Sequence, residues 1–188
     1  MARLLLENGA DINAQGGEFG NALQAAAFSG EAALVRLLLE NGADINTLGG
    51  TFGNALQAAA ISGGEAVVQL LLENGVDVNA QGGDFGNALQ AAAHYGNEAV
   101  IRLLLENGVD INAQGGEYGD ALQAAAHSGW GVVVQLLLEN GADINARGGK
   151  YGSALHAAEC GGHEAVARLL LGNGPEIVSQ DGEYTDAP

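Results

Sequence analysis

The 188-residue chain has few basic residues, one cysteine and no long apolar run, and each scarcity excludes a class of protein. Only 6 Lys and Arg stand against 23 Asp and Glu, so the clustered cations that bind nucleic acid or anionic membranes are missing. The single Cys160 excludes an internal disulfide and fits a reducing compartment. No apolar run approaches the ~20 residues of a membrane span, and the N-terminus lacks the layout of a secretion signal. We therefore expect a cytoplasmic chain, with the nucleus left open, that binds neither membrane nor nucleic acid.

Acidic residues and a strict repeat dominate what is present. The net charge is −17, and much of the acid recurs at fixed positions of the repeat, which indicates solvated framework charges. Such a field attracts a basic partner. The repeat is 33 residues long, without insertion or deletion between Gly16 and Gln180. Its five copies are 16–48, 49–81, 82–114, 115–147 and 148–180.

Both ends of the chain depart from this pattern. Residues 1–15 match the second half of a repeat, so we expect Leu4, Leu5 and Leu6 to be exposed or to pair elsewhere. Residues 181–188 begin a degenerate sixth copy, which we expect to be frayed. The register between the ends is unbroken, and a period of 33 predicts one continuous solenoid of stacked units.

Within one copy, local signals predict two helices and a hairpin. Asn21 is a natural N-cap for a first helix that begins at Ala22 and ends before Gly30. A second helix is expected over Ala32–Glu40, with an apolar side at helical spacing, and Asn41-Gly42 ends it. Turn-forming residues over 49–53 then predict a short hairpin finger.

These residues resemble the ankyrin repeat family, whose units are 33 residues long. The resemblance rests on Ala-Ala-x-x-Gly followed by Leu-Leu-Leu-Glu-Asn-Gly-Ala-Asp-Ile-Asn over 26–46, which recurs along nearly the whole chain. It implies an all-α solenoid of helix-turn-helix units with β-hairpin fingers. Asn-Ala-Leu-Gln replaces the family's Thr-Pro-Leu-His, which keeps the cap but predicts softer units. This variant is similar to fungal ankyrin arrays carried by larger signalling proteins with a nucleotide-binding domain.

The chain contains only incomplete versions of catalytic and metal-binding motifs. Gly148-Gly149-Lys150-Tyr151 lacks the first glycine and the Ser or Thr of a phosphate-binding P-loop. His163-Glu164 lacks the second histidine of a zinc-protease helix. His94, His127 and Cys160 share one repeat position, but units stacked ~8 to 10 Å apart separate them too far for one zinc ion. We expect no enzyme activity and no cofactor.

Differences among the copies instead predict a partner-binding surface. The resemblance places hairpin tips and the ends of the first helices on a concave binding face. There, Phe28 and Ile61 are expected to form an apolar patch, and Tyr95 to offer a large amphipathic contact. The predicted partner-binding residues are Glu18, Phe28, Thr51, Ile61, Asp84, His94, Tyr95, Glu117, His127 and Lys150.

Other positions have a different interpretation. A ring recurs at Phe19, Phe52, Phe85, Tyr118, Tyr151 and Tyr184, which indicates packing at the base of the hairpins. Trp130 is either a private contact or simple drift. The leading hypothesis is a non-catalytic scaffold that binds a protein partner, including one with a basic surface. The alternatives are a regulatory array of a larger nucleotide-binding signalling protein and self-association through the N-terminal edge.

Overall fold

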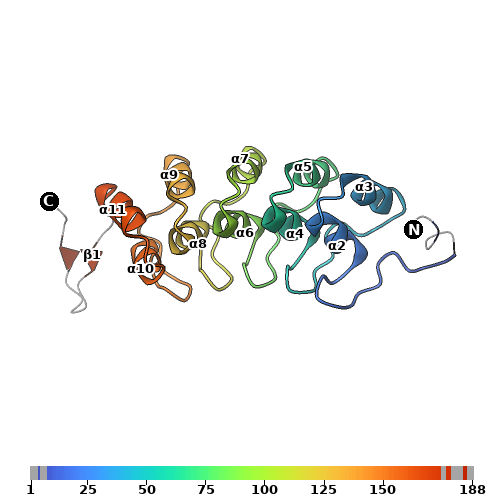
Figure 1. The fold of residues 1–188 in the computed structure, drawn as a ribbon, viewed down its shortest axis with the longest axis horizontal. Coiled ribbons are helices and arrows are strands. Elements are labelled where there is room, and N and C mark those ends of the chain that lie inside the picture. Colours follow the sequence, from blue (N-terminus) through green and yellow to red (C-terminus); the bar gives the residue numbers. More distant parts are fainter. Residues whose placement is uncertain (1–3, 5–7, 175–176, 179–183, 186–188) are drawn as a thin grey trace.

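The computed structural model describes residue 4 and residues 8–174, 177–178 and 184–185, and its helices form two parallel rows (Figure 1). The inner row holds the first helix of each repeat: α2 (Ala22–Phe28), α4 (Ala55–Ser62), α6 (Ala88–Tyr95), α8 (Ala121–Ser128) and α10 (Ala154–Cys160). The outer row holds the second helices: α3 (Ala32–Glu40), α5 (Glu65–Glu73), α7 (Glu98–Glu106), α9 (Gly131–Glu139) and α11 (Glu164–Gly172). The predicted all-α repeat solenoid is confirmed.

Local capping sets the helix bounds. The Asn21 side chain accepts a hydrogen bond from the backbone N–H of Gln24 at 2.9 Å, and α2 begins at the next residue, as predicted. The outer helix α3 spans the predicted Ala32–Glu40. Its end is closed by Gly42, whose φ of 89° is in the left-handed region, so that Ala43 N–H reaches the carbonyl of Leu38.

The core lies between the two rows. Apart from Ala22 and Ala25 of α2, the alanines of the inner helices are almost fully buried, and their small side chains let neighbouring inner helices pack closely. The outer helices bury one apolar side, on which Ile101 and Leu104 are fully buried, and pack less closely with one another. The outer row therefore fans out further than the inner row, and the stack curves (Figure 1).

Each repeat projects a finger closed by a bridge between two glycines, as between Gly49 and Gly53. The residue at each fingertip bonds to the tip before it. Thr51 N–H donates to the Glu18 carbonyl at 2.9 Å, and Asp84 N–H donates to the Thr51 carbonyl at 3.3 Å. The same bond recurs from Glu117 to Asp84 and from Lys150 to Glu117. The five tips are thus joined by backbone hydrogen bonds, which the sequence did not predict.

A second set of bonds joins the loops that follow the outer helices. The Asn13 side chain accepts from Asp44 N–H at 2.8 Å, and Asn46 accepts from Asp77 N–H at 2.9 Å. Asn79 and Asn112 repeat this contact with the next loop along. The recurring Asp and Asn thus serve as framework residues, which explains why they hardly vary between copies.

Buried glutamines supply a third connection between repeats. Gln57 donates from Nε2 to the carbonyls of Gly82 and Gly86 in the next finger, at 2.9 and 2.8 Å. Gln24 and Gln90 donate in the same way to the two glycine carbonyls of the finger that follows each of them. The Asn–Gln pair therefore replaces the Thr–His hydrogen bonding of the usual family pattern with bonds that cross between units.

The junction between the fourth and fifth repeats departs from this rule. Here the N-cap is Asp120, and Gln123 donates to its Oδ2 at 2.9 Å, with no bond to the fifth finger. The second side-chain oxygen of Asp120 accepts a hydrogen bond from Gln123, whereas an Asn cap has an NH₂ group in its place and cannot accept one there. The fifth finger also differs, because Gly152 N–H donates to Gly148 O while the other fingers bond in the opposite direction.

The ends of the chain fall largely outside the described residues. Leu4 is exposed, as one of the two alternatives expected, whereas Leu5 and Leu6 are not among those residues. Strand β1 (Ile177–Val178) pairs antiparallel with β2 (Tyr184–Thr185). Tyr184 lies in β2 opposite Val178, and the predicted packing of its ring concerns a side chain outside the described part of the structure. The rest of the expected sixth copy, 181–188, is not described.

Candidate functional site

Rings from the fingers and from the ends of the inner helices form two clusters along one row, which we call the ring ladder. Ring contacts join the members within each cluster, whereas none is found between Phe52 and Phe85 among the described residues. The members are Phe19, Phe28, Phe52, Phe85, His94, Tyr95, Tyr118, His127 and Tyr151.

The first half of the ring ladder is apolar. Phe28, at the end of α2, lies between the ring of its own finger, Phe19, and the ring of the next finger, Phe52. The ring centroids are 5.4 and 4.8 Å from that of Phe28, and the Phe28 and Phe52 rings are nearly parallel. All three side chains are half-buried, so each leaves part of its ring at the surface.

The second half is polar. His94 lies between Phe85 and Tyr118, with centroids at 5.2 and 4.8 Å, and His127 lies between Tyr118 and Tyr151, at 5.4 and 4.6 Å. Tyr95 remains 43% exposed beside them and offers the largest free ring of this half.

Hydrogen bonds fix both imidazoles. His94 Nδ1 lies 2.9 Å from Ser128 Oγ, and His127 Nε2 lies 3.3 Å from the Tyr151 hydroxyl. Burial lowers the pKa of His94, with a further lowering by His127 and an opposing effect of Glu117. Burial also raises the pKa of Tyr118. Both shifts favour the neutral form of the group concerned.

One predicted contact residue is in the wrong place. Ile61 is only 7% exposed, because this aliphatic side chain lies at an internal repeat and is covered from both sides. The expected exposed pair of Phe28 and Ile61 is therefore absent, and Phe28 instead shares its patch with the finger rings. Sequence reasoning had assigned those rings to packing alone.

The fingertips lie next to the finger rings in the sequence, and four of the five tip residues are charged. Glu18, Thr51, Asp84, Glu117 and Lys150 are all exposed, as predicted. Lys150 Nζ lies 2.8 Å from Glu117 Oε1 and 5.5 Å from the centroid of the Tyr151 ring. The hydrogen bond from Lys150 lowers the pKa of Glu117, and the same bond raises that of Lys150.

Trp130 makes a private contact, one of the two alternatives drawn from the sequence. Its Nε1 donates to the carbonyl of His94 at 2.8 Å, and its ring lies against Gly96. Asn97 occupies the same position one repeat earlier and donates to Ala60 O at 2.7 Å. In these two repeats, the position thus ties the start of the outer helix to the end of the preceding inner helix, a role the sequence analysis missed.

Among the described residues, no group of three His, Cys, Asp or Glu side chains could hold a metal ion. Cys160 Sγ approaches only His156 Nε2, at 3.5 Å, and is exposed.

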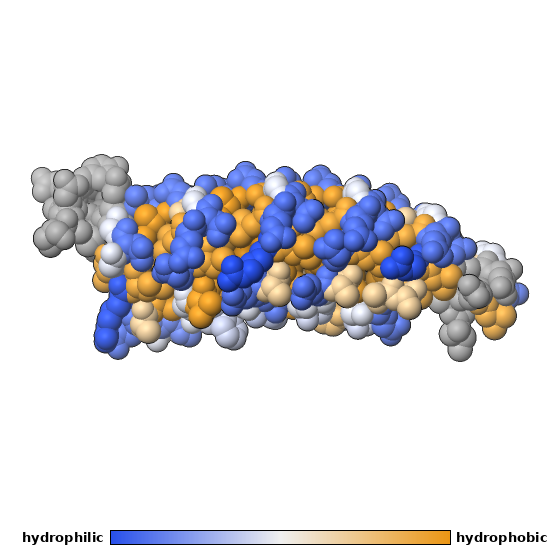
Figure 2. All heavy atoms as spheres, turned by 90° about the horizontal axis from the view of Figure 1, so that it is seen from above, coloured by the Kyte–Doolittle hydropathy of each residue, from blue (hydrophilic) through white to orange (hydrophobic). Residues whose placement is uncertain are grey.

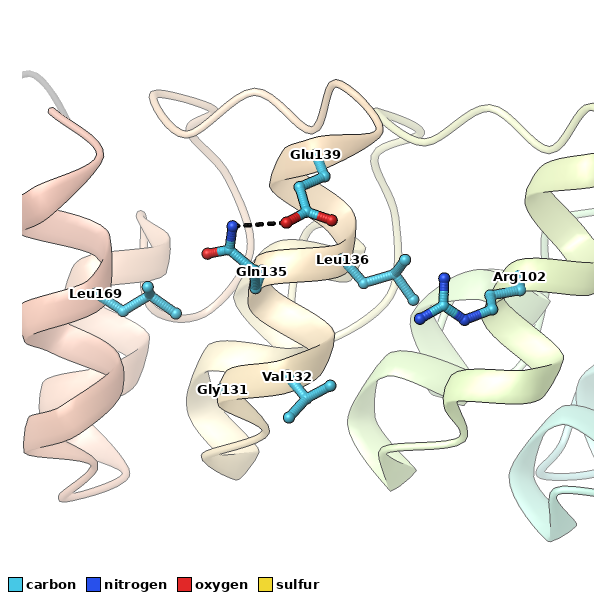
Figure 3. A pocket seen from close by; sticks show the side chains of 7 residues that line it. All are labelled: Arg102, Gly131, Val132, Gln135, Leu136, Glu139 and Leu169. Atoms are coloured by element: carbon cyan, nitrogen blue, oxygen red, sulfur yellow. Dashed lines mark hydrogen bonds between the residues drawn. The ribbon is translucent and has the colours of Figure 1, made fainter.

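The outer helices form the opposite face. Figure 2 shows on it a broad apolar band crossed by hydrophilic stripes. An open hollow of about 360 Å³ lies there around α9 (Figure 3). Its walls include Arg102 of α7, Val132 of α9 and Leu169 of α11, and none belongs to the ring ladder. Across the described part of the chain, no helix has the length and apolarity needed to cross a membrane.

The chain is a helical repeat solenoid, because it consists of stacked helix pairs with a projecting finger in each repeat. A family model described as ankyrin repeats, in three copies, matches residues 1–82, 50–115 and 89–181, so the chain belongs to the ankyrin repeat family. A comparison with curated proteins found no match. Ankyrin repeats generally mediate protein–protein interaction, and the proteins that carry them are typically non-catalytic.

Proposed function

We propose that this chain is a non-catalytic scaffold that binds a protein partner along the ring ladder and the fingertips. The observation that carries the proposal is the ring ladder itself. Rings at an interface supply large contact areas at a small cost in side-chain entropy, and Tyr and Trp are enriched at binding hot spots.

The framework supports this use. The tips are held by backbone bonds, the fingers by buried glutamines and the imidazoles by Ser128 and Tyr151. A surface fixed in this way loses little further freedom when a partner binds, so more of the contact energy remains as affinity. The half-buried rings and the exposed Tyr95 leave apolar area for that contact.

Site-specific photo-crosslinking in an extract of the source cells tests the proposal. A benzoylphenylalanine introduced in place of Tyr95 is expected to give a discrete crosslinked protein. The matched control carries the same residue in place of Val132, which is 66% exposed on the outer face (Figure 3). Circular dichroism checks that both variants keep the helical fold.

An adduct formed only at Tyr95 supports binding on the inner face. Adducts of equal yield at both positions indicate random collisions, and an adduct only at Val132 moves the binding face to the outer helices. Either of these outcomes contradicts the proposal.

A further inference from the structure

The rings of neighbouring fingers repeat at a spacing close to that of alternate residues in an extended peptide. The centroids of Phe19 and Phe52 lie 5.5 Å apart, and those of the pairs Phe85–Tyr118 and Tyr118–Tyr151 lie 6.2 Å apart. The tips of the second and third fingers, between these pairs, are joined by the bond from Asp84 N–H to the Thr51 carbonyl. In an extended strand, residues i and i+2 point to the same side and lie about 6.6 Å apart. An extended segment along the ring ladder therefore presents one side chain to each repeat, and the side chains between point away.

The protein itself shows how a cation is held on this surface. The ammonium of Lys150 comes from the fifth fingertip, pairs with the carboxylate of the preceding tip, Glu117, and lies near the ring of its own finger, Tyr151. A carboxylate from one finger and a ring from the next thus form one cation position.

At two earlier fingertips, a carboxylate is likewise followed by a finger with a ring, but no lysine or arginine is present. Glu18 is followed by the finger of Thr51 and Phe52, and Asp84 is followed by the finger of Glu117 and Tyr118. No ion pair joins Glu18 or Asp84 to another described residue.

These two positions are two steps of the ring ladder apart. The step between them contains Thr51, which is neutral, and the stacked rings of Phe28 and Phe52. Along the first three repeats, the surface therefore presents an acidic group, then an apolar patch, then a second acidic group.

Resting on the proposed function, we propose that the partner presents an extended segment with Lys or Arg at positions i and i+4 and an apolar residue at i+2. The first cation pairs with Glu18, the apolar side chain covers Phe28 and Phe52, and the second cation pairs with Asp84. The net charge of −17 adds a general attraction for such a segment, but the spacing comes from the repeats.

Fluorescence polarisation with two labelled peptides tests this spacing. One contains Lys-Ser-Leu-Ser-Lys between serines, and the other contains Lys-Ser-Leu-Ser-Ser-Lys with the same composition and length. General charge attraction is equal for the two peptides. Because exposed ion pairs are individually weak, we expect the matched peptide to bind about two- to fivefold more tightly.

Variants of the chain assign the contact. The double change Glu18→Gln and Asp84→Asn is expected to reduce binding of the matched peptide to the level of the shifted one. The control double change, Glu40→Gln and Glu106→Gln, removes the same charge from exposed ends of outer helices and is expected to keep the preference.

Equal binding of the two peptides, equal effects of the two double changes, or no binding of either peptide would overturn this inference. Each of these results leaves the photo-crosslink at Tyr95 as a separate test. A crosslinked partner without peptide discrimination would retain the proposed function and reject the segment chemistry.

Discussion

Replacing the N-cap Asn54 by Asp is expected to remove the glutamine hydrogen bonds between two repeats. Asn54 caps α4, and the neighbouring Gln57 is free to grip the next finger because the Asn side chain offers it no second acceptor. In Asn54→Asp, the new carboxylate oxygen accepts from Gln57 Nε2, as Asp120 accepts from Gln123 in the natural chain. The bonds to Gly82 and Gly86 are then lost.

The size of the effect follows from the bonds involved. Two hydrogen bonds, at 2.9 and 2.8 Å, each contribute about 0.5–1.5 kcal/mol to the free energy of unfolding. Asp and Asn are equivalent as caps, the new bond from Gln57 to the carboxylate returns about 0.5–1.5 kcal/mol, and a negative charge at a helix N-terminus returns about 0.3–1 kcal/mol. We expect Asn54→Asp to lower the free energy of unfolding by up to about 1 kcal/mol.

Urea denaturation followed by circular dichroism measures this change, and the reciprocal substitution is the matched control. Asp120→Asn releases Gln123 toward the fifth finger but also loses the 3.2 Å bond from Gln114 Nε2 to Asp120 Oδ2, so it is expected to raise the free energy of unfolding by less than about 1 kcal/mol. Opposite signs from the same pair of residues would be hard to obtain by any general effect of charge. A shift of the same sign in both variants, or no shift in Asn54→Asp, would refute the reasoning.

Three further substitutions test the packing and the charges. Leu104→Ala, at a fully buried site, should cost about 2–5 kcal/mol by urea denaturation, and a loss below 1 kcal/mol would contradict the assigned core. Gly96→Ala should destabilise more than Gly108→Ala, because both have positive φ but only the first brings a Cβ within 2.6 Å of the Trp130 ring; equal thermal shifts would contradict this contact. The pKa of His94 is lowered in the folded state, so unfolding takes up a proton and stability falls as the pH drops below the unfolded value of about 6.5. His94→Gln should flatten that part of the stability profile, and an unchanged slope would contradict the burial of the imidazole.

The helices were predictable because their signals are local. Asn21, Gly42 and the apolar spacing of 32–40 act within one or two turns, so the expected bounds of α3 agree with the structure. The 33-residue period likewise predicted a stack, since each unit must bury its apolar face against the next.

The ring ladder was predictable only in part, because it forms between units. The sequence shows that Phe28 and Phe52 each occupy a recurring position, but not that the rings, separated by 23 residues, lie 4.8 Å apart. Ile61 was misplaced for the same reason, since its cover comes from its neighbours. The exceptional Asp among the Asn caps was a visible signal at Asp120, and its effect on Gln123 could have been inferred from hydrogen-bonding capacity.

The missing glutamine bridge at the fourth junction has a mechanical consequence. A chain pulled from its ends transmits the load through contacts between neighbouring repeats only, so such a stack lengthens in steps of one unit. Three sets of cross-links resist extension at the earlier junctions, while Gln123 leaves the last one without its amide link. Under tension, the fifth repeat is therefore expected to detach before the other four, taking Tyr151 with it, while the rings of the first four repeats stay in place.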